Sequence, residues 1–226
     1  MNRSLFIPSV PTLSAESRQI PSGNEATSAV NILDAIEHRR SVRKYKEEPV
    51  PSALVMRLLH AAILAPSACN QQPWAFAVIR GRNRLEHYSK RVRAYLSSAI
   101  SQNLALHQHF NALDDVADDV FHRAGTLVVI FAKPALYDPL IACCFAAQNL
   151  MLAAHGFGLG SCPIGFAQPW LNQPEIKTEL GMPLKYTAAM PIVVGWPAIT
   201  PIAPPRSEPE FVWQEEIARS KPVSAI

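Results

Sequence analysis

The chain has 226 residues, of which 49% are hydrophobic and 17% are charged. This composition is globular and excludes a disordered or fibrous protein, and the length allows one large domain. The formal net charge of +3 is too small to indicate nucleic-acid binding by itself. It does suit a protein that binds an anionic ligand.

Cysteine usage and apolar runs bear on the cellular compartment. The four cysteines contain no C-x-x-C pair, so neither a zinc framework nor a disulfide scaffold is predicted. Free thiols in a reducing cytoplasm are the simplest interpretation. The apolar triplet 5–7 is too short for a signal peptide. The run 139–154 falls short of the ~20 residues that a membrane span needs, so we expect a buried helix and no membrane association.

The first elements lead to a basic cluster. Residues 1–28 are rich in proline and serine, which predicts an extension that stays loose unless a partner surface holds it. We expect a single domain over 29–226. Helical spacing over 30–36 precedes the cluster 39–44. Ser52 is a plausible N-cap for a helix that runs to Ile63 and stops before Pro66.

The middle of the chain alternates strands and helices. After a loop at 67–73, residues 74–79 are predicted to form a buried strand. Residues 83–122 are polar and predicted helical, and they are the expected lid over the site. The continuous apolar run 126–131 predicts a strand buried on both faces. The helix predicted at 139–155 is apolar all round, which indicates a core helix or a subunit interface.

The last elements complete an α+β pattern. A short helix is expected at 173–180 and a strand at 190–195, followed by a Pro-rich tail that starts at Trp196 and lies along a surface. Too few βαβ units are present for a doubly wound sheet. We therefore expect a central sheet flanked by helices.

The basic cluster Arg39-Arg40-Ser41-Val42-Arg43 stands where a helix is predicted to end. Guanidinium groups and a hydroxyl make a good phosphate clamp because arginine presents a planar fork of donors. A solvated basic turn explains the same residues. A nucleic-acid patch is a third interpretation, although the run is short and lacks interleaved aromatic residues.

The loop 65–74 lies between an apolar helix and a buried strand, and it contains small residues, a hydroxyl and three side-chain amides. Amides both donate and accept hydrogen bonds, so they suit the edge of a heteroaromatic ring. A simple turn that leads into the strand is the alternative.

Three other patterns do not predict a site. The glycines in 156–160 follow a helix, whereas a dinucleotide fingerprint follows a strand. Cys162 has no adjacent base and no G-x-S-x-G elbow, so a covalent nucleophile is not predicted. His107 and His109 face different ways on a helix and are interpreted as surface histidines. No metal site is expected.

Taken together, these segments resemble the FMN-dependent nitroreductase family. The resemblance rests on 39–43 with Tyr45 and Pro49-Val50, on 65–76, on 146–154 leading into 158–162, and on 191–197. It extends over about residues 30–213, and the first two motifs are specific when they occur together.

The resemblance implies a central mixed sheet in an intertwined homodimer, with one FMN at each end of the interface. It places Arg39, Ser41 and Arg43 around the phosphate, ribityl chain and pyrimidine edge, the proline–serine–asparagine loop on the flavin of the other subunit, and a main-chain N–H of 163–165 near flavin N5. The residues expected to bind FMN are Arg39, Arg40, Ser41, Arg43, Pro66, Ser67, Ala68, Asn70, Gln72, Pro163, Ile164, Gly165 and Arg206.

Two departures from the family pattern matter. The family often has a lysine just before the tail arginine, where this chain has Pro204 at or near the place, which removes one cation from the clamp. Some members carry a Glu-Gly pair after the proline-containing loop, where this chain has Ile164-Gly165-Phe166. Only main chain is then left to contact N5.

The reaction that the resemblance implies is a two-step exchange. NADH or NADPH delivers hydride to flavin N5, and a nitroaromatic, quinone or similar electron-poor acceptor then takes the donor's place. The flavin does the chemistry, so no catalytic side chain is predicted. The alternatives are a reductive dehalogenase or flavin-cleaving synthase of the same fold, a flavin-storing protein without activity, and a nucleic-acid module.

Overall fold

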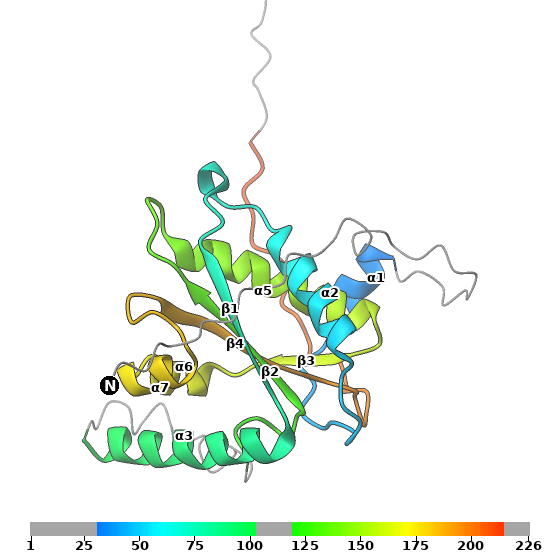
Figure 1. The fold of residues 1–226 in the computed structure, drawn as a ribbon. Helices are drawn as coiled ribbons and strands as arrows, with labels where there is room; N and C mark the ends of the chain where they lie inside the picture. The colour runs from blue at the N-terminus through cyan, green and yellow to red at the C-terminus, as the bar shows by residue number, and fades with distance from the viewer. Residues whose placement is uncertain (1–30, 103–118, 215–226) are drawn as a thin grey trace, which may run out of the picture.

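The computed structural model describes residues 31–102 and 119–214. Its centre is a four-stranded sheet in the order β1-β2-β4-β3, formed by β1 (Trp74–Arg80), β2 (Thr126–Ala132), β4 (Thr187–Gly195) and β3 (Gly160–Pro163) (Figure 1). All three strand pairs are antiparallel. The parallel component of the expected mixed sheet is the single bridge between Ser41 and Ser161 at the β3 edge.

Strand β2 is buried along its whole length, as predicted, because both faces of the sheet are covered. Alternate side chains of a strand point to opposite faces. Leu127, Val129 and Phe131 therefore enter one core cluster, while Val128 and Ile130 enter the other.

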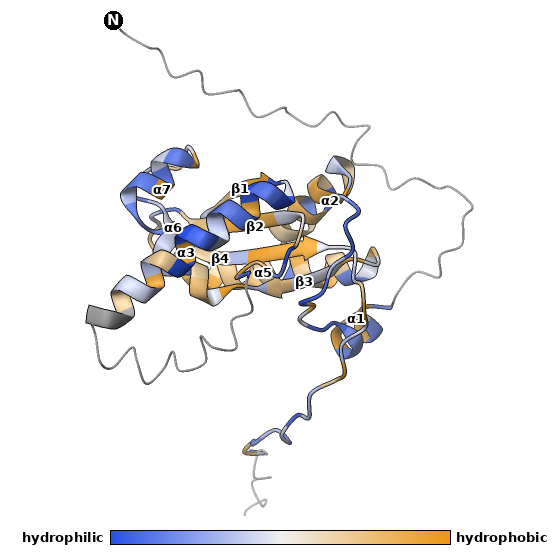
Figure 2. Ribbon diagram, turned by 90° about the horizontal axis from the view of Figure 1, so that it is seen from below, coloured by the Kyte–Doolittle hydropathy of each residue, from blue (hydrophilic) through white to orange (hydrophobic). Residues whose placement is uncertain are grey.

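Helices cover the two faces in two groups (Figure 1). One face carries α2 (Ser52–Ile63) and α5 (Pro139–Gly156). The other carries α3 (Arg82–Gln102), α6 (Gln168–Leu171) and α7 (Pro174–Glu179). The short α1 (Ile32–His38) precedes the basic cluster, as predicted. In Figure 2 the apolar colour concentrates on the sheet, whereas α3 and α7 show hydrophilic segments.

Helix α5 is half covered. Its buried side includes Cys143, Ala146 and Leu150, which pack against the sheet. On its other side Ile141 is 55% and Phe145 48% exposed. By length and composition alone α5 is the one described helix that could cross a membrane, but it serves as a core helix. The expectation that it is covered all round is not met within one copy of the chain.

Several predicted boundaries were wrong for local reasons. The N-cap of α2 is Pro51, not Ser52, and the Ser52 hydroxyl accepts a hydrogen bond from Arg80 Nη1 at 2.5 Å instead. The helix expected over 83–122 is described only to residue 102, and residues 120–123 form a turn with His122 and Arg123 in the left-handed region. Strand β4 begins three residues before the predicted Met190, at Thr187.

Strand β3 was missed and was expected to be part of a compact loop. Its four residues, Gly160–Pro163, have little intrinsic strand propensity. They are extended because they pair with β4, from Gly160 opposite Gly195 to Pro163 opposite Ile192.

The basic segment lies against the edge formed by β3 and the end of β4. Val42 N–H donates to Ser161 O at 3.0 Å, and Lys46 N–H donates to Trp196 O at 2.8 Å. A Cβ atom added to Gly160 would stand 2.7 Å from Val42 Cβ, and one added to Gly195 would stand 2.8 Å from Tyr45 Cδ1. Both glycines are therefore required for this close approach.

We expect Gly160→Ala to destabilise the protein, because the new methyl group must displace Val42 and the hydrogen-bonded basic segment that carries it. Overpacking of this kind costs about 1–3 kcal/mol, or roughly 2–4 °C in Tm for each kcal/mol in a chain of this size. Thermal unfolding measures it. Gly156→Ala is the control, since a Cβ there meets nothing within 4 Å. Equal Tm values for the two variants would contradict the packing argument.

Candidate functional site

The basic residues predicted to form a phosphate clamp lie at the β3 edge. Arg39 is the C-cap of α1, and the chain then runs extended along β3, with Ser41 in a bridge to Ser161. Arg206, on the C-terminal tail, lies near enough to Arg39 for its charge to lower the pKa of Arg39. The structure thus brings together arginines from two segments that are distant in the sequence.

The electrostatics of this cluster favour an anion. Burial lowers the pKa of Arg39 first, and the charges of Arg206 and Arg40 lower it further. In the described ranges, no carboxylate forms an ion pair with Arg39, Arg40, Arg43 or Arg206. Guanidinium groups that crowd together without a counter-ion repel one another, and a bound anion relieves that repulsion.

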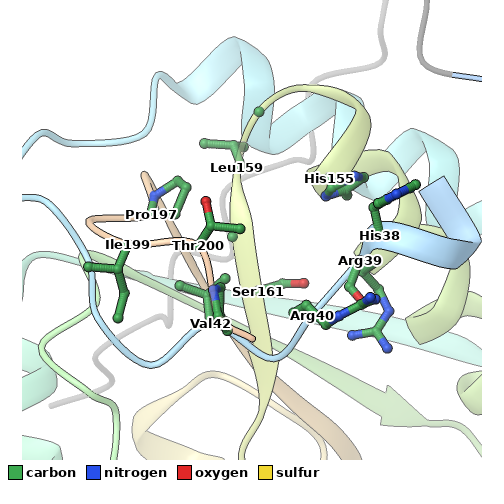
Figure 3. Close-up of a pocket in the computed structure, with 13 residues that line it drawn as sticks. His38, Arg39, Arg40, Val42, His155, Leu159, Ser161, Pro197, Ile199 and Thr200 are labelled. Carbon is green, nitrogen blue, oxygen red and sulfur yellow. The ribbon is translucent and has the colours of Figure 1, made fainter. Parts of the chain in front are cut away.

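A small cavity of about 150 Å³ opens beside Arg39 and Arg40. Figure 3 shows His38, Arg39, Arg40 and His155 on one side of it and residues of the tail on the other, with Ser161 between them. The pKa of His155 is lowered by burial and then by the charges of His38, Arg39 and Arg40. His155 is therefore neutral near pH 7, and its pKa rises when a bound anion offsets those cations.

The Arg40 side chain has a structural role at the end of α1. Its Nη1 donates to the main-chain oxygens of Glu37 and Arg39 at the end of α1. Its Nε is buried with no partner in the structure. Arg40 therefore supports the end of α1.

The segment 163–165 offers one main-chain donor. Pro163 has no N–H, and Ile164 N–H donates to Pro191 O at 2.8 Å. Gly165 N–H, at the start of η4 (Gly165–Ala167), donates to no backbone or side-chain acceptor in the described residues. Gly165 is exposed, and a Cβ there would meet nothing within 4 Å. Of the three predicted residues, only Gly165 has an N–H that is available to a ligand.

The loop 66–72 is held in an unusual conformation. Cys69, Asn70 and Gln72 have φ values of 50°, 52° and 47°, in the left-handed region, which costs non-glycine residues about 1–2 kcal/mol each. Ser67 Oγ accepts from Gln72 N–H at 3.0 Å, and Asn70 Oδ1 accepts from Gln72 Nε2 at 3.0 Å. Strain of this kind clusters at binding sites, which agrees with the expected role of the loop.

One subunit does not bring this loop to the arginines. The loop precedes β1, while the arginines lie against β3, and these strands form opposite edges of the sheet (Figure 1). With a strand spacing of about 4.8 Å, the two edges are about 14 Å apart. The predicted site residues therefore form two separate groups, and Pro66, Ser67, Ala68, Asn70 and Gln72 make up the second.

Cys162 lies beside Ser41, Arg39 and Arg43. Burial raises its pKa, while Arg43, a hydrogen bond from Ser41, and Arg39 oppose that shift. The group therefore stays a thiol near neutral pH, which speaks against a thiolate nucleophile. All four cysteines of the chain are free.

Sequence reasoning missed His38, His155, Gly160 and Gly195. Both histidines lie in the last turn of a helix, His38 in α1 and His155 in α5. A basic residue at the end of each predicted helix is the sequence pattern that could have identified them. His107, His109, residues 103–118 of the expected lid and the extension 1–28 lie outside the described residues.

Comparisons with known proteins agree with this arrangement. The chain matches the nitroreductase family over residues 36–196. A chloronitrobenzene nitroreductase from Comamonas testosteroni is 28% identical over 199 residues, which is 73% of this chain and 86% of that protein. An NADH dehydrogenase from Thermus thermophilus is 28% identical over 178 residues, 71% of this chain and 83% of that protein.

A solved structure shows the same fold. The nitroreductase with bound FMN from Desulfitobacterium hafniense superimposes with a TM-score of 0.67 at 25% identity, covering 80% of this chain and 98% of that chain. The family match includes the basic cluster, the strained loop and the 163–165 segment. This chain therefore belongs to the nitroreductase family and is an oxidoreductase of that family.

Proposed function

We propose that the protein binds FMN and uses NADH or NADPH to reduce nitroaromatic, quinone or similar electron-poor acceptors. The observation that carries this proposal is the arginine cluster at the β3 edge, which lacks acidic partners in the described residues. The relative named as a chloronitrobenzene nitroreductase and the FMN-bound structure support the choice of cofactor and substrate class.

The cluster fits the FMN phosphate in charge. A phosphate monoester carries about −1.5 to −2 charges at pH 7, which Arg39, Arg43 and Arg206 balance. Arg43 lies close enough to lower the pKa of Cys162 and of His122, so its charge belongs to the same edge of the sheet. Ser41 adds a hydroxyl between the arginines.

The residues that follow β3 would hold the isoalloxazine ring of FMN. Bound FMN supplies the hydride transfer chemistry itself. The Gly165 N–H would donate a hydrogen bond to the ring and so orient it. No acidic or basic side chain is needed near the ring, since these residues bind, orient and exclude water.

The second group of site residues comes from another copy of the chain. We propose a homodimer in which the loop 66–72 of one subunit contacts the flavin bound by its partner. Exposed apolar side chains on α1 and α5 support this assembly: Ile32, Leu33 and Ile36 on α1 are 60%, 61% and 53% exposed, and α5 adds Ile141 and Phe145. A second copy covers the α5 face that one chain leaves open. The free cysteines suit a cytoplasmic location.

The purified protein is expected to be yellow, with about one FMN per subunit. Titration of the apoprotein is expected to show FMN binding at least about tenfold tighter than riboflavin, because only FMN carries the phosphate. Anaerobic NADH or NADPH bleaches the flavin band, and nitrobenzene or a quinone restores it. Equal affinity for the two flavins contradicts the phosphate clamp. Binding without bleaching indicates storage, and flavin breakdown in air indicates the flavin-cleaving alternative.

Removal of the Gly165 N–H is expected to slow flavin reduction by about 100-fold, the typical effect of one lost donor. Gly165→Pro does this at the first residue of η4, and Ile164 (φ −115°, ψ 74°) lies outside the α region that a following proline disfavours. Gly165→Ala keeps the N–H and is the matched control. Stopped-flow absorbance measures both rates. Similar rates for the two variants would show that this donor does not contact the flavin.

A charge on the open face of α5 is expected to separate the subunits. Phe145→Glu places a carboxylate in the apolar interface and weakens the dimer by about 100-fold or more, and FMN dissociates as the loop of the partner is lost. Light scattering after gel filtration gives the mass. Leu184→Glu is the control, since Leu184 is 60% exposed on the turn between α7 and β4 and belongs to neither α1 nor α5. A dimeric, yellow Phe145→Glu protein contradicts the proposed interface.

A further inference from the structure

A second cavity lies at the opposite end of the molecule from the arginines. It encloses about 410 Å³ and is lined by Gln71, Pro73, residues 133–135, Lys185 and Tyr186. These segments meet because Trp74, Ala132 and Thr187 stand side by side across β1, β2 and β4. The cavity therefore lies where β1 and β4 begin and β2 ends.

This cavity carries two positive charges and no acidic lining residue. Lys133 is half-buried and Lys185 is exposed. Neither forms an ion pair within residues 31–102 and 119–214. The acidic residue nearest to Lys133 along the chain, Asp138, accepts a hydrogen bond from Leu140 N–H at 2.9 Å and caps α5. Two ammonium groups without a counter-ion attract a multiply charged anion.

The cavity shares a wall with the strained loop. Gln71 Oε1 accepts a hydrogen bond from Leu136 N–H at 3.2 Å, which ties the loop to the segment after β2. Gln71 also lines the cavity. Under the proposed function, this loop contacts the flavin of the partner, so an anion bound in the cavity lies next to that flavin.

We propose that this cavity binds the phosphate groups of the nicotinamide dinucleotide donor. The inference rests on the proposed function. The cofactor phosphate has its own clamp at the other edge of the sheet, so the pair Lys133 and Lys185 is left for a different anion. The pyrophosphate of NADH or NADPH has the required charge, and lysines on flexible stems suit a ligand that must enter and leave at each turnover.

The test compares donors with and without phosphate on the FMN-loaded enzyme. In Lys133→Ala/Lys185→Ala, the KM for NADH and NADPH is expected to rise by about tenfold or more. The kcat with either donor stays unchanged, as do all constants for 1-benzyl-1,4-dihydronicotinamide, which carries no phosphate. Lys90→Ala is the control, because Lys90 pairs with Glu86 on α3 at 2.8 Å, outside the cavity. It is expected to match the wild type with every donor.

Three outcomes overturn the inference. Unchanged KM values for NADH and NADPH show that the lysines do not bind the donor. An equal loss with the phosphate-free donor shows that the substitutions disturb the loop instead. A raised KM for 4-nitrobenzoate but not for nitrobenzene, with the donor constants unchanged, assigns the cavity to an acidic acceptor. Failure of the proposed function is seen separately, since wild-type protein would then bind no FMN or would not be bleached by either dinucleotide.

Discussion

The close approach of the basic segment to the sheet edge is the constraint on which the rest of the site depends. Val42 and Tyr45 pack where Gly160 and Gly195 leave no room for a side chain, and main-chain hydrogen bonds to Ser161 and Trp196 hold the segment in place. Because Val42 is anchored, its neighbours Ser41 and Arg43 have fixed positions. Under the proposed function, the phosphate clamp is thus built on the sheet edge, and the main chain that carries its residues is in place before any ligand binds, which reduces the entropy lost on binding.

Under the proposed function, the same arrangement gives each copy of the chain half of a site. The arginines and Gly165 lie at the β3 edge, whereas the amide loop precedes β1 at the other edge. The sheet between them is packed on both faces, so no small movement joins the two halves. Exposed apolar residues on α1 and α5 form the surface proposed to pack against a second copy. Under the proposed function, assembly and cofactor binding are therefore coupled, and each stabilises the other.

The groups that the protein presents at the β3 edge act mainly through electrostatics. Unpaired guanidinium groups, a neutral His155 and one available main-chain N–H form a positive, donor-rich edge. The pKa of Cys162 is raised by burial, so a thiol and not a competing thiolate stands among these groups. Such a site stabilises negative charge on a bound ring and phosphate without transferring a proton from a side chain. Strain in the loop 66–72 is maintained by its own hydrogen bonds, which presents its amides in one orientation.

The sequence by itself determined the features that depend on neighbouring residues. Hydrophobic spacing located α1, α2, β1, β2 and α5, the apolar run 126–131 predicted a strand buried on both faces, and the motifs identified the family. Tertiary structure decided the strand pairing, hydrogen bonds and close packing between segments that are distant in the chain. Strand β3 exists because it pairs with β4, not because Gly160–Pro163 favour a strand. The Ile164 N–H donates to Pro191 O, so Gly165 N–H is the donor that remains in this segment. Val42 packs where a side chain at position 160 would lie, so this position requires glycine. These outcomes follow from pairing and packing between residues that are far apart in the chain, and no local pattern of side chains encodes such contacts.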